Sequence, residues 1–359
     1  MADRGARVIL VEGSAIGAGA SGRNLGAIQH PFDPILAPLY AESITRYRAL
    51  ADMSGGDFRI GRDPAGLLLL NRDPDAAARQ AARLRAAMPE LHAELLDPDA
   101  VIALEPSLAH GPAGIRLETG FPIPPASATA SWARLAEDRG AELLVGSPGH
   151  PRQRDARVTG VSLDDGTQID AEVVLVAAGP WSPRLVDPDG GWERIRATYG
   201  VTVQLDLGDG APRHIVEEDE LDGINRAEAA TERAARAEET DPPSLFSMAS
   251  AGGVSTLGST FLPAEPDPSG IERLLIRRAA AFLPAVVEAD VVGRRMCARP
   301  QSIDGRPFIG AVPGVSGLFV CTGHGPWGIS IGPASAAMAA RTVLDGMPPP
   351  AELDAARPI

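Results

Sequence analysis

The pattern of apolar and polar positions predicts two kinds of region along the chain. In the first, apolar runs typical of buried strands alternate with segments whose apolar residues recur at helical spacing. The strand-like runs are Arg7–Val11, Glu142–Val145, Val173–Gly179, which ends in small residues, and Phe319–Thr322. The helical segments are Pro34–Met53, Pro74–Met88, Asp97–Leu104, Ser127–Arg139 and Ile329–Leu344, with Asp97 or Asp99 capping the third. This alternation predicts an α/β fold with a doubly wound sheet.

In the second kind of region, short strands follow one another and predict an antiparallel sheet. They are Asp57–Ile60, Ala65–Leu70, Thr198–Leu207, Arg213–Val216, Leu245–Met248 and Val254–Gly258. A separate hairpin joins Arg157–Leu163 to Gln168–Ala171 through the turn residues Asp164, Asp165 and Gly166. Glu217–Asp241 is a charged insertion, which we expect to be an exposed helix or a mobile loop.

The first strand-like run, Arg7–Val11, ends in an acid, Glu12. An acid that closes the second strand of a doubly wound nucleotide fold can accept hydrogen bonds from both ribose hydroxyls. Met1–Gly5 is typical of the last turn of a helix with glycine just past its end. We therefore interpret Met1–Glu12 as the second half of a βαβ unit, and expect its first strand and glycine loop upstream of Met1.

An alternative places the phosphate loop inside the chain. Gly17–Gly22 matches the G-x-G-x-x-G pattern, so Arg7–Val11 could itself be the first strand. In that motif the first glycine follows the strand directly and the loop opens a helix. Here Gly13–Ile16 intervene, and the following sequence runs into Pro31 and Pro34. The spacing therefore disfavours this alternative.

Composition narrows the classes of partner. The 359 residues suffice for one large or two intermediate domains, and 44% of them are hydrophobic. The net charge of −14, from 33 basic against 47 acidic residues, disfavours nucleic acid and anionic membranes as partners. The cysteines, Cys297 and Cys321, do not make a disulfide framework. With no signal peptide or long apolar run apparent, we expect a cytoplasmic protein, without a metal site.

Two segments resemble a known family. The loop Gly17–Gly26 after Glu12 and the twelve-residue segment Arg299–Gly310, RPQSIDGRPFIG, are similar to those of the D-amino-acid oxidase, glycine oxidase and sarcosine oxidase family of FAD-dependent oxidoreductases. The resemblance implies a doubly wound, Rossmann-like FAD-binding domain, here N-terminally truncated, interleaved with an antiparallel-sheet substrate domain. The implied FAD-binding segments are residues 1–56, 126–190 and 294–359. The implied substrate segments are residues 57–125 and 191–293.

The resemblance also implies where FAD would bind. The implied cofactor contacts are Glu12, Ser21, Arg23, Asn24, Gly26, Ala178, Gly179, Trp181, Gly323, Gly325, Pro326, Trp327, Gly328 and Ile329. Arg23 suits a pyrophosphate through its charge and fork geometry. The helix that follows Gly323–Gly328 would direct its N-terminal N–H groups and positive dipole end toward the flavin pyrimidine.

Three further residues have implied roles near the reaction. Arg299 is placed to bind a substrate carboxylate in two-pronged fashion, with a structural salt bridge as the alternative. His324 borders the implied flavin edge, and a structural histidine is its alternative. Cys297 stands where some sarcosine oxidases carry a cysteine bonded to the flavin. A buried, inert thiol is the more common state of such a residue, so we expect non-covalent FAD.

The implied activity is oxidation of the C–N bond of an amino acid or secondary amine. A neutral amine would pass its α-hydrogen as hydride to flavin N5, and the imine would hydrolyse later. The partners would be this small molecule and oxygen or another electron acceptor. The alternative is a flavin-free fragment, or a non-catalytic binding protein derived from such an enzyme, because the expected glycine loop is not found before Arg7.

Overall fold

The computed structural model describes residues 1–219 and 244–359 of the chain. The strands described are β1 (Ile9–Glu12), β2 (Ala27–Ile28), β3 (Leu67–Asn71), β4 (Glu94–Leu96), β5 (Ala113–Leu117), β6 (Phe121–Pro122), β7 (Glu142–Val145), β8 (Gly149–Arg154), β9 (Arg157–Leu163), β10 (Gln168–Asp170), β11 (Val174–Val176), β12 (Ile195–Asp206), β13 (Ile215–Glu218), β14 (Ser244–Ala251), β15 (Val254–Thr260), β16 (Asp290–Ser302), β17 (Phe308–Ala311) and β18 (Leu318–Thr322). The α-helices described are α1 (Ala20–Arg23), α2 (Ala37–Met53), α3 (Pro74–Ala87), α4 (Pro98–Leu104), α5 (Pro125–Asp138), α6 (Ser182–Val186), α9 (Pro268–Ala279) and α10 (Gly328–Asp345).

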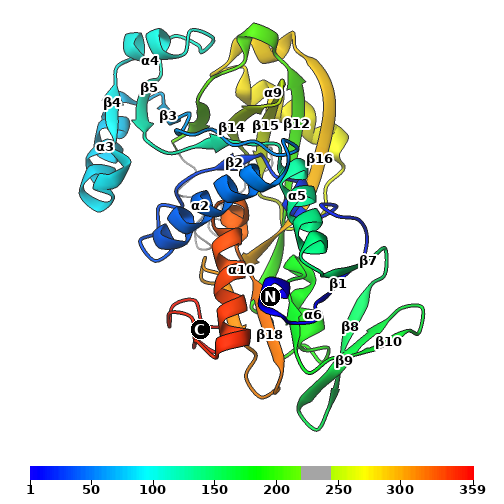
Figure 1. Ribbon diagram of the computed structural model, residues 1–359. Helices are drawn as coiled ribbons and strands as arrows, with labels where there is room; N and C mark the ends of the chain where they lie inside the picture. Colours follow the sequence, from blue (N-terminus) through cyan, green and yellow to red (C-terminus); the bar gives the residue numbers. More distant parts are fainter. Residues whose placement is uncertain (220–243) are drawn as a thin grey trace.

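A mixed sheet of eight strands forms the upper half of the molecule (Figure 1). Its order is β16-β12-β15-β14-β13-β3-β5-β4, and its neighbouring strands are antiparallel except for the parallel pair β13 and β3. Helix α9 covers one face, where Leu275 packs with Val203, Phe246 and Leu257. Because side chains alternate between faces along a strand, the intervening residues of β12, β15 and β16 point to the opposite face, toward the lower half.

The parallel strands of the lower half form two separate pieces. β1 pairs with β7, and β11 pairs with β18, which continues to the antiparallel β17. Within the described residues no hydrogen bonds join the two pieces. Leu10, Val145 and Val173 remain 39–45% exposed, although runs of this kind are usually buried on both faces. The doubly wound layer is therefore present as two parallel pairs.

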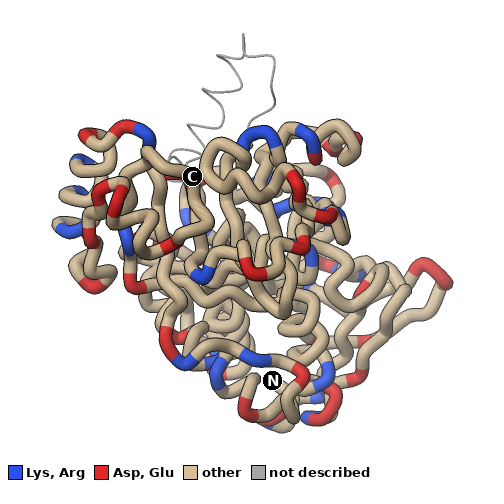
Figure 2. Tube along the Cα trace, turned by 90° about the horizontal axis from the view of Figure 1, so that it is seen from above, with Lys and Arg blue, Asp and Glu red and all other residues tan. Residues whose placement is uncertain are grey.

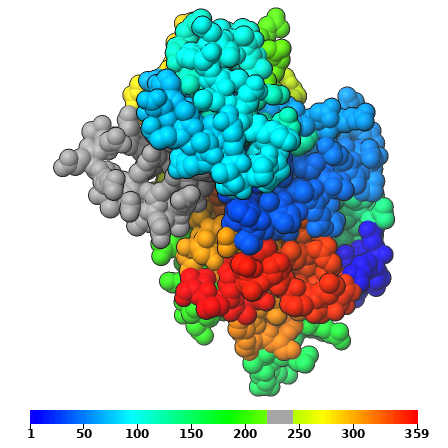
Figure 3. All heavy atoms as spheres, turned by 90° about the vertical axis from the view of Figure 1, so that its left-hand side faces the viewer, coloured from blue at the N-terminus to red at the C-terminus, as the bar shows by residue number. Residues whose placement is uncertain are grey.

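Helices α2 and α10 lie side by side between these layers (Figures 1 and 3). Leu36, Leu39, Ile331 and Trp327 form a buried cluster at their contact. The N–H of Ala334, which belongs to the same cluster, donates to the Ser43 hydroxyl at 3.1 Å. This packing fixes the start of α10, on which the turn after β18 depends.

Charged residues lie mainly at the periphery, where acidic and basic positions are interspersed (Figure 2). Several are paired, as in Arg306–Asp33 at 2.7 Å and Arg357–Asp304 at 2.7 Å. Among the described residues no helix is both long and apolar enough to cross a bilayer.

Most predicted elements are confirmed, and the helical turn predicted at Met1–Gly5 is present as a 3₁₀ turn. Residues Ala2–Arg4 make a 3₁₀ turn that ends at Gly5, whose φ of 83° lies in the left-handed region. Asp97, one of the two cap candidates, accepts from the N–H of Ala100 at 2.8 Å.

The strand predicted at Asp57–Ile60 is wrong, because these residues form a bend without a partner strand. The bend buries Phe58 against Tyr47, with the two ring centroids 5.8 Å apart, and this contact takes the place of strand pairing. The predicted insertion Glu217–Asp241 lies outside the described residues except at its start, where Glu217 and Glu218 close β13.

A buried acid joins α4 to β13. Glu105 is 2% exposed, and its Oε1 accepts from the N–H groups of Arg213 and His214 and lies 2.5 Å from His214 Nδ1. Burial opposes ionisation of Glu105, but the hydrogen bonds from His214 and Arg213 outweigh it and lower the pKa of the carboxyl from its ordinary 4.5.

We expect Glu105→Ala to lower the free energy of unfolding by about 3 kcal/mol at neutral pH, because it leaves three buried donors without an acceptor. Because the folded pKa lies below the unfolded one, the contribution of Glu105 is complete above pH 4.5 and is lost as the pH falls through the folded pKa. Urea unfolding at pH 7 and pH 4 measures both effects. The control is Glu94→Ala, which removes an exposed partner of Arg116 and should change little.

Candidate active site

The loop after β1 is braced by its own side chains. Glu12 Oε1 accepts from the N–H of Ser14 at 2.8 Å. The Asn24 amide donates to the carbonyls of Ala20 and Ser21, and its oxygen accepts from the N–H of Gly26. A Cβ on Gly26, whose φ is +88°, would lie 2.3 Å from the Ile123 carbonyl oxygen. The loop therefore has a fixed shape, and Asn24 serves that shape.

A cavity of about 1080 Å³ opens beside this loop. Ala18, Gly19 and Arg23 line it from the loop, and Pro180, Trp181 and Arg184 line it from the turn after β11. β12 contributes Arg196 and Tyr199, and β16 contributes Met296, Cys297 and Ala298. Trp181 is 61% exposed, although large aromatic side chains are usually covered. The cavity is as large as a site for a drug-sized ligand, and its wall carries several arginines.

The turn after β11 is tied to the C-terminal strand. Gly179 has a φ of +57°, and its carbonyl accepts from the Thr322 hydroxyl of β18 at 3.0 Å. Ala178 packs partly buried against the cluster that includes Val176, Trp192 and Phe308. These contacts position Pro180 and Trp181 at the cavity wall.

The turn after β18 holds a half-buried histidine, His324, whose Nε2 atom is buried. Burial lowers the pKa of His324 to about 4, so the ring is neutral at pH 7. Its Nε2 has no hydrogen-bond partner among the described residues. Gly325 lies against the Gln301 side chain, and the 3₁₀ turn Gly325–Trp327 leads directly into α10. Trp327 is 6% exposed and belongs to the core at the contact of α2 and α10.

Strand β16 presents Cys297 and Arg299 on the face opposite α9. Arg299 Nη1 donates to the Thr260 carbonyl at 2.7 Å, and Nη2 donates to the Ser259 hydroxyl. Its guanidinium also lies 4.8 Å from the centroid of the Phe261 ring. Arg23 and Arg299 both lower the pKa of the Cys297 thiol, although burial is the larger effect and raises it. The predicted cofactor arginine and the predicted substrate arginine thus act on one thiol.

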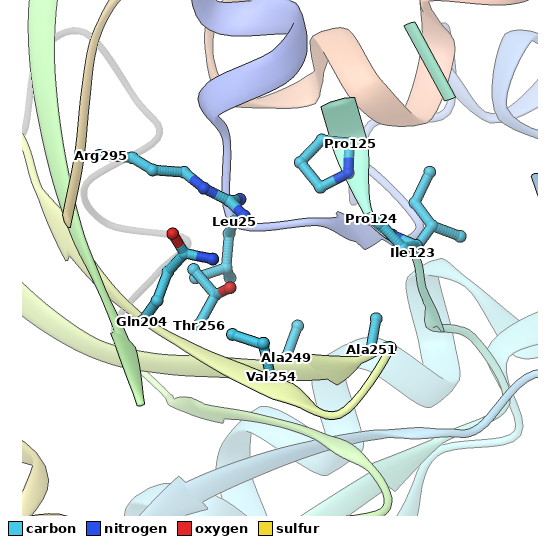
Figure 4. Close-up of a pocket in the computed structure, with 11 residues that line it drawn as sticks. Leu25, Ile123, Pro124, Pro125, Gln204, Ala249, Ala251, Val254, Thr256 and Arg295 are labelled. Atoms are coloured by element: carbon cyan, nitrogen blue, oxygen red, sulfur yellow. The ribbon is translucent and has the colours of Figure 1, made fainter. Parts of the chain in front are cut away.

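A smaller cavity, of about 150 Å³, lies on the same face of the sheet (Figure 4). Its walls are apolar, with Leu25, Ile123, Pro124, Pro125, Ala249, Ala251 and Val254. Its polar side chains are Gln204, Thr256 and Arg295. None of these residues was predicted from the sequence. The signal that could have found Arg295 is the alternation Arg295, Cys297, Arg299 along one strand.

The predicted site residues are brought together in part. Arg23, Trp181 and Cys297 line the large cavity, and Ala178 and Gly179 come directly before its wall. Glu12, Ser21, Asn24 and Gly26 lie in or beside the loop that flanks it, without lining it. Residues Gly323–Ile329 form the turn and the first residues of α10. Their contacts with a cofactor stay predictions, as does the division into domains, whose boundary at residue 294 falls within β16.

Comparison with known proteins gives the family. Residues 1–342 match the family model described as FAD dependent oxidoreductase (DAO). The chain belongs to this family. A glycine oxidase of Bacillus licheniformis is 26% identical over 70% of this chain and 62% of its own length. A D-amino acid dehydrogenase of Cereibacter sphaeroides is 32% identical over 77% of this chain and 60% of its own length. The aligned part thus spans about three fifths of these DAO-family relatives.

Solved structures show the same fold. The glycine oxidase of Bacillus cereus superposes with a TM-score of 0.80 at 22% identity, covering 96% of this chain and 90% of its own. The iminodiacetate oxidase of Chelativorans sp. superposes with a TM-score of 0.80 at 21% identity, covering 98% and 94%. The DAO-family fold is therefore present in this chain, as the sequence predicts, although the sheet predicted to be antiparallel contains the parallel pair β13 and β3.

The described residues fit the FAD that characterises the family. The large cavity has the size for a dinucleotide, and Arg23 offers a charged fork to a pyrophosphate at its wall. The unpartnered Nε2 of His324 is a buried polar atom that a bound molecule could satisfy. Glu12 uses Oε1 for the loop, and its Oε2 has no described hydrogen bond.

We expect FAD to be held without a covalent bond through Cys297. The thiolate is the form that bonds to carbon, and burial raises the pKa of this thiol against the opposing effect of Arg299 and Arg23. Acid precipitation of the flavin-loaded protein should therefore release all the flavin into the supernatant. The expectation would be contradicted if the precipitated wild-type protein stayed yellow while precipitated Cys297→Ser lost its colour.

Proposed function

We propose that this DAO-family protein is an FAD-dependent oxidoreductase that oxidises the C–N bond of an amino acid or secondary amine. The observation that carries the proposal is one large cavity that is lined both by Arg23, from the loop after β1, and by Cys297, two positions before Arg299 on β16. A cofactor site and a carboxylate site would thus meet at one place.

When bound, FAD supplies the acceptor for a hydride from the α-carbon, and the resulting imine is hydrolysed in water. Arg299 binds and orients the substrate carboxylate, because two of its N–H groups go to Thr260 and Ser259 and the remaining ones are available. The anchored guanidinium is held in one orientation by these contacts and by Phe261. Oxygen or another acceptor then reoxidises the enzyme.

His324 contributes a neutral imidazole. Since its pKa is lowered to about 4 by burial, it carries no charge at pH 7 and can make a hydrogen bond without opposing Arg299. In this proposal His324 contacts the cofactor or the substrate. The amine must itself be neutral to lose a hydride, because a protonated amine has no lone pair to stabilise the cation that forms.

The proposal is tested by anaerobic mixing of the FAD-loaded protein with a panel of amino acids and secondary amines. Loss of the visible absorbance of oxidised flavin identifies a substrate. The proposal would be contradicted if the protein binds FAD but no member of the panel reduces the bound flavin.

A second candidate is a flavin-free fragment or binding protein derived from such an enzyme. The observation that favours it is the separation of the parallel strands into β1–β7 and β11–β18. The visible spectrum of the purified protein, with and without added FAD, separates the two candidates. Protein that never acquires a flavin spectrum supports this second candidate.

A further inference from the structure

Two arginines on the face of the sheet opposite α9 have no acidic partner among the described residues. Arg295 and Arg299 lie on the same side of β16, because their positions differ by an even number. Arg294, which points to the other side, pairs with Glu272, and Arg278 pairs with Glu218. Arg295 makes a single described hydrogen bond, from Nη1 to the Asn24 carbonyl at 3.3 Å.

This lack of partners is unusual in a chain so rich in acids. The chain has 47 acidic residues against 33 basic ones, yet none of the described acids reaches these two guanidinium groups. Burial lowers the pKa of both arginines, so the surroundings oppose their charge. A guanidinium nevertheless stays protonated in proteins. An anion from outside the chain would offset the free-energy cost of keeping these charges away from water.

The small cavity gives the anion a place. In Figure 4 the side chain of Arg295 extends from β16 toward Leu25, and Gln204 and Thr256 lie together near it. The remaining lining is apolar, from residues such as Val254 and Ile123. An apolar cavity with hydrogen-bond donors at one end suits a ligand with a short carbon chain that ends in a carboxylate.

A third donor lies beside Arg295. Thr202 stands opposite Arg295 in the register of β12 and β16, is 3% exposed, and its hydroxyl has no hydrogen-bond partner among the described residues. The guanidinium of Arg299 leans over Gly200, where a Cβ would lie 2.4 Å from Nη2. Gly200 stands opposite Cys297, so the Arg299 head group is displaced along the strand toward Arg295.

We propose that this face binds a dicarboxylic amino acid or amine, with its α-carboxylate on Arg299 and its second carboxylate on Arg295 in the small cavity. This assignment rests on the proposed function, of which it names the substrate class. Thr202, which stands opposite Arg295, donates to the second carboxylate. A basic arm would be repelled by Arg295, and an apolar arm would leave the guanidinium unpaired.

The substrate class can be tested by binding without turnover. Isothermal titration calorimetry of the purified protein compares succinate with butyrate, which has the same number of carbon atoms and one carboxylate. We expect succinate to bind at least about tenfold more tightly. Arg295→Gln should abolish this difference, and Arg295→Lys should retain part of it because it keeps the charge. The control Arg294→Gln alters the opposite face and should retain all of it.

Equal affinity of the wild-type protein for succinate and butyrate would overturn the assignment. So would a preference for succinate that survives unchanged in Arg295→Gln. If Arg295→Gln does not fold, as judged by its circular dichroism, Arg295→Lys decides, because unchanged succinate affinity in that variant excludes a two-pronged contact.

Flavin reduction then separates this inference from the proposed function. With FAD bound, dicarboxylic amines such as aspartate and iminodiacetate should have a kcat/KM at least about tenfold above that of glycine, and Arg295→Gln should lower it for the dicarboxylates alone. Oxidation of glycine and the dicarboxylates with equal kcat/KM refutes the inference and leaves the proposed function standing. Reduction by no amine refutes the proposed function, while the titration still decides the anion site.

Discussion

Replacing Arg299 by lysine should raise the KM for the amino acid substrate about a hundredfold, in a protein that still folds and binds FAD. Lysine keeps the positive charge but loses the planar fork that holds a carboxylate by two parallel hydrogen bonds. It also loses the contacts that hold the guanidinium against Ser259, Thr260 and Phe261, so the charge is less well positioned. Steady-state kinetics with saturating FAD measure the change.

The control for this prediction is Arg306→Lys. Arg306 also makes a two-pronged contact, with Asp33, but both of its prongs are already used by that acid, whereas Arg299 has no acidic partner among the described residues. The Arg306→Lys variant should be less stable than the wild-type protein but have the same KM. If Arg299→Lys has the wild-type KM in a folded, flavin-loaded protein, Arg299 is a structural residue and the assignment falls.

The polypeptide of residues 1–359 by itself should bind FAD weakly, with a dissociation constant of about 1 μM or higher. β1 and β11 are not joined by hydrogen bonds, and apolar residues such as Leu10 and Val173 stay exposed beside them. A pyrophosphate is held well by several N–H groups at the start of a helix. The loop after β1 offers Arg23, but α1 has only four residues and no side-chain cap.

A titration of this polypeptide with FAD, followed by flavin fluorescence, measures the constant. A matched polypeptide with a βα segment of about 30 residues fused before Met1 should bind much more tightly, because a strand between β1 and β11 would pair with both edges. Tight, stoichiometric binding by residues 1–359 alone would contradict the prediction. It would mean that Gly17–Gly22 supplies the phosphate contacts that its spacing disfavours.

Local signals in the sequence were sufficient for most elements. Glu142–Val145 and Arg157–Leu163 were predicted with the bounds that β7 and β9 have, since an apolar run and a turn of Asp and Gly are properties of a few neighbouring residues. The prediction of a strand at Asp57–Ile60 failed because these residues form a bend that buries Phe58. No short-range signal distinguishes such a bend from a strand. The resemblance carried by Arg299–Gly310 gave the family, which the comparison confirms.

The sequence by itself determined the order of elements and the family, because these depend on local pattern and on matching motifs. The residues that would contact FAD stay predictions from those motifs. Tertiary structure decided which distant residues share a surface. Arg295 and Thr202 meet through the pairing of β12 with β16, about ninety residues apart in the chain, and Leu25 closes the cavity above them from a third segment. The register of such a pairing sets which side chains share a face, and it depends on how the whole sheet packs, which no short segment specifies.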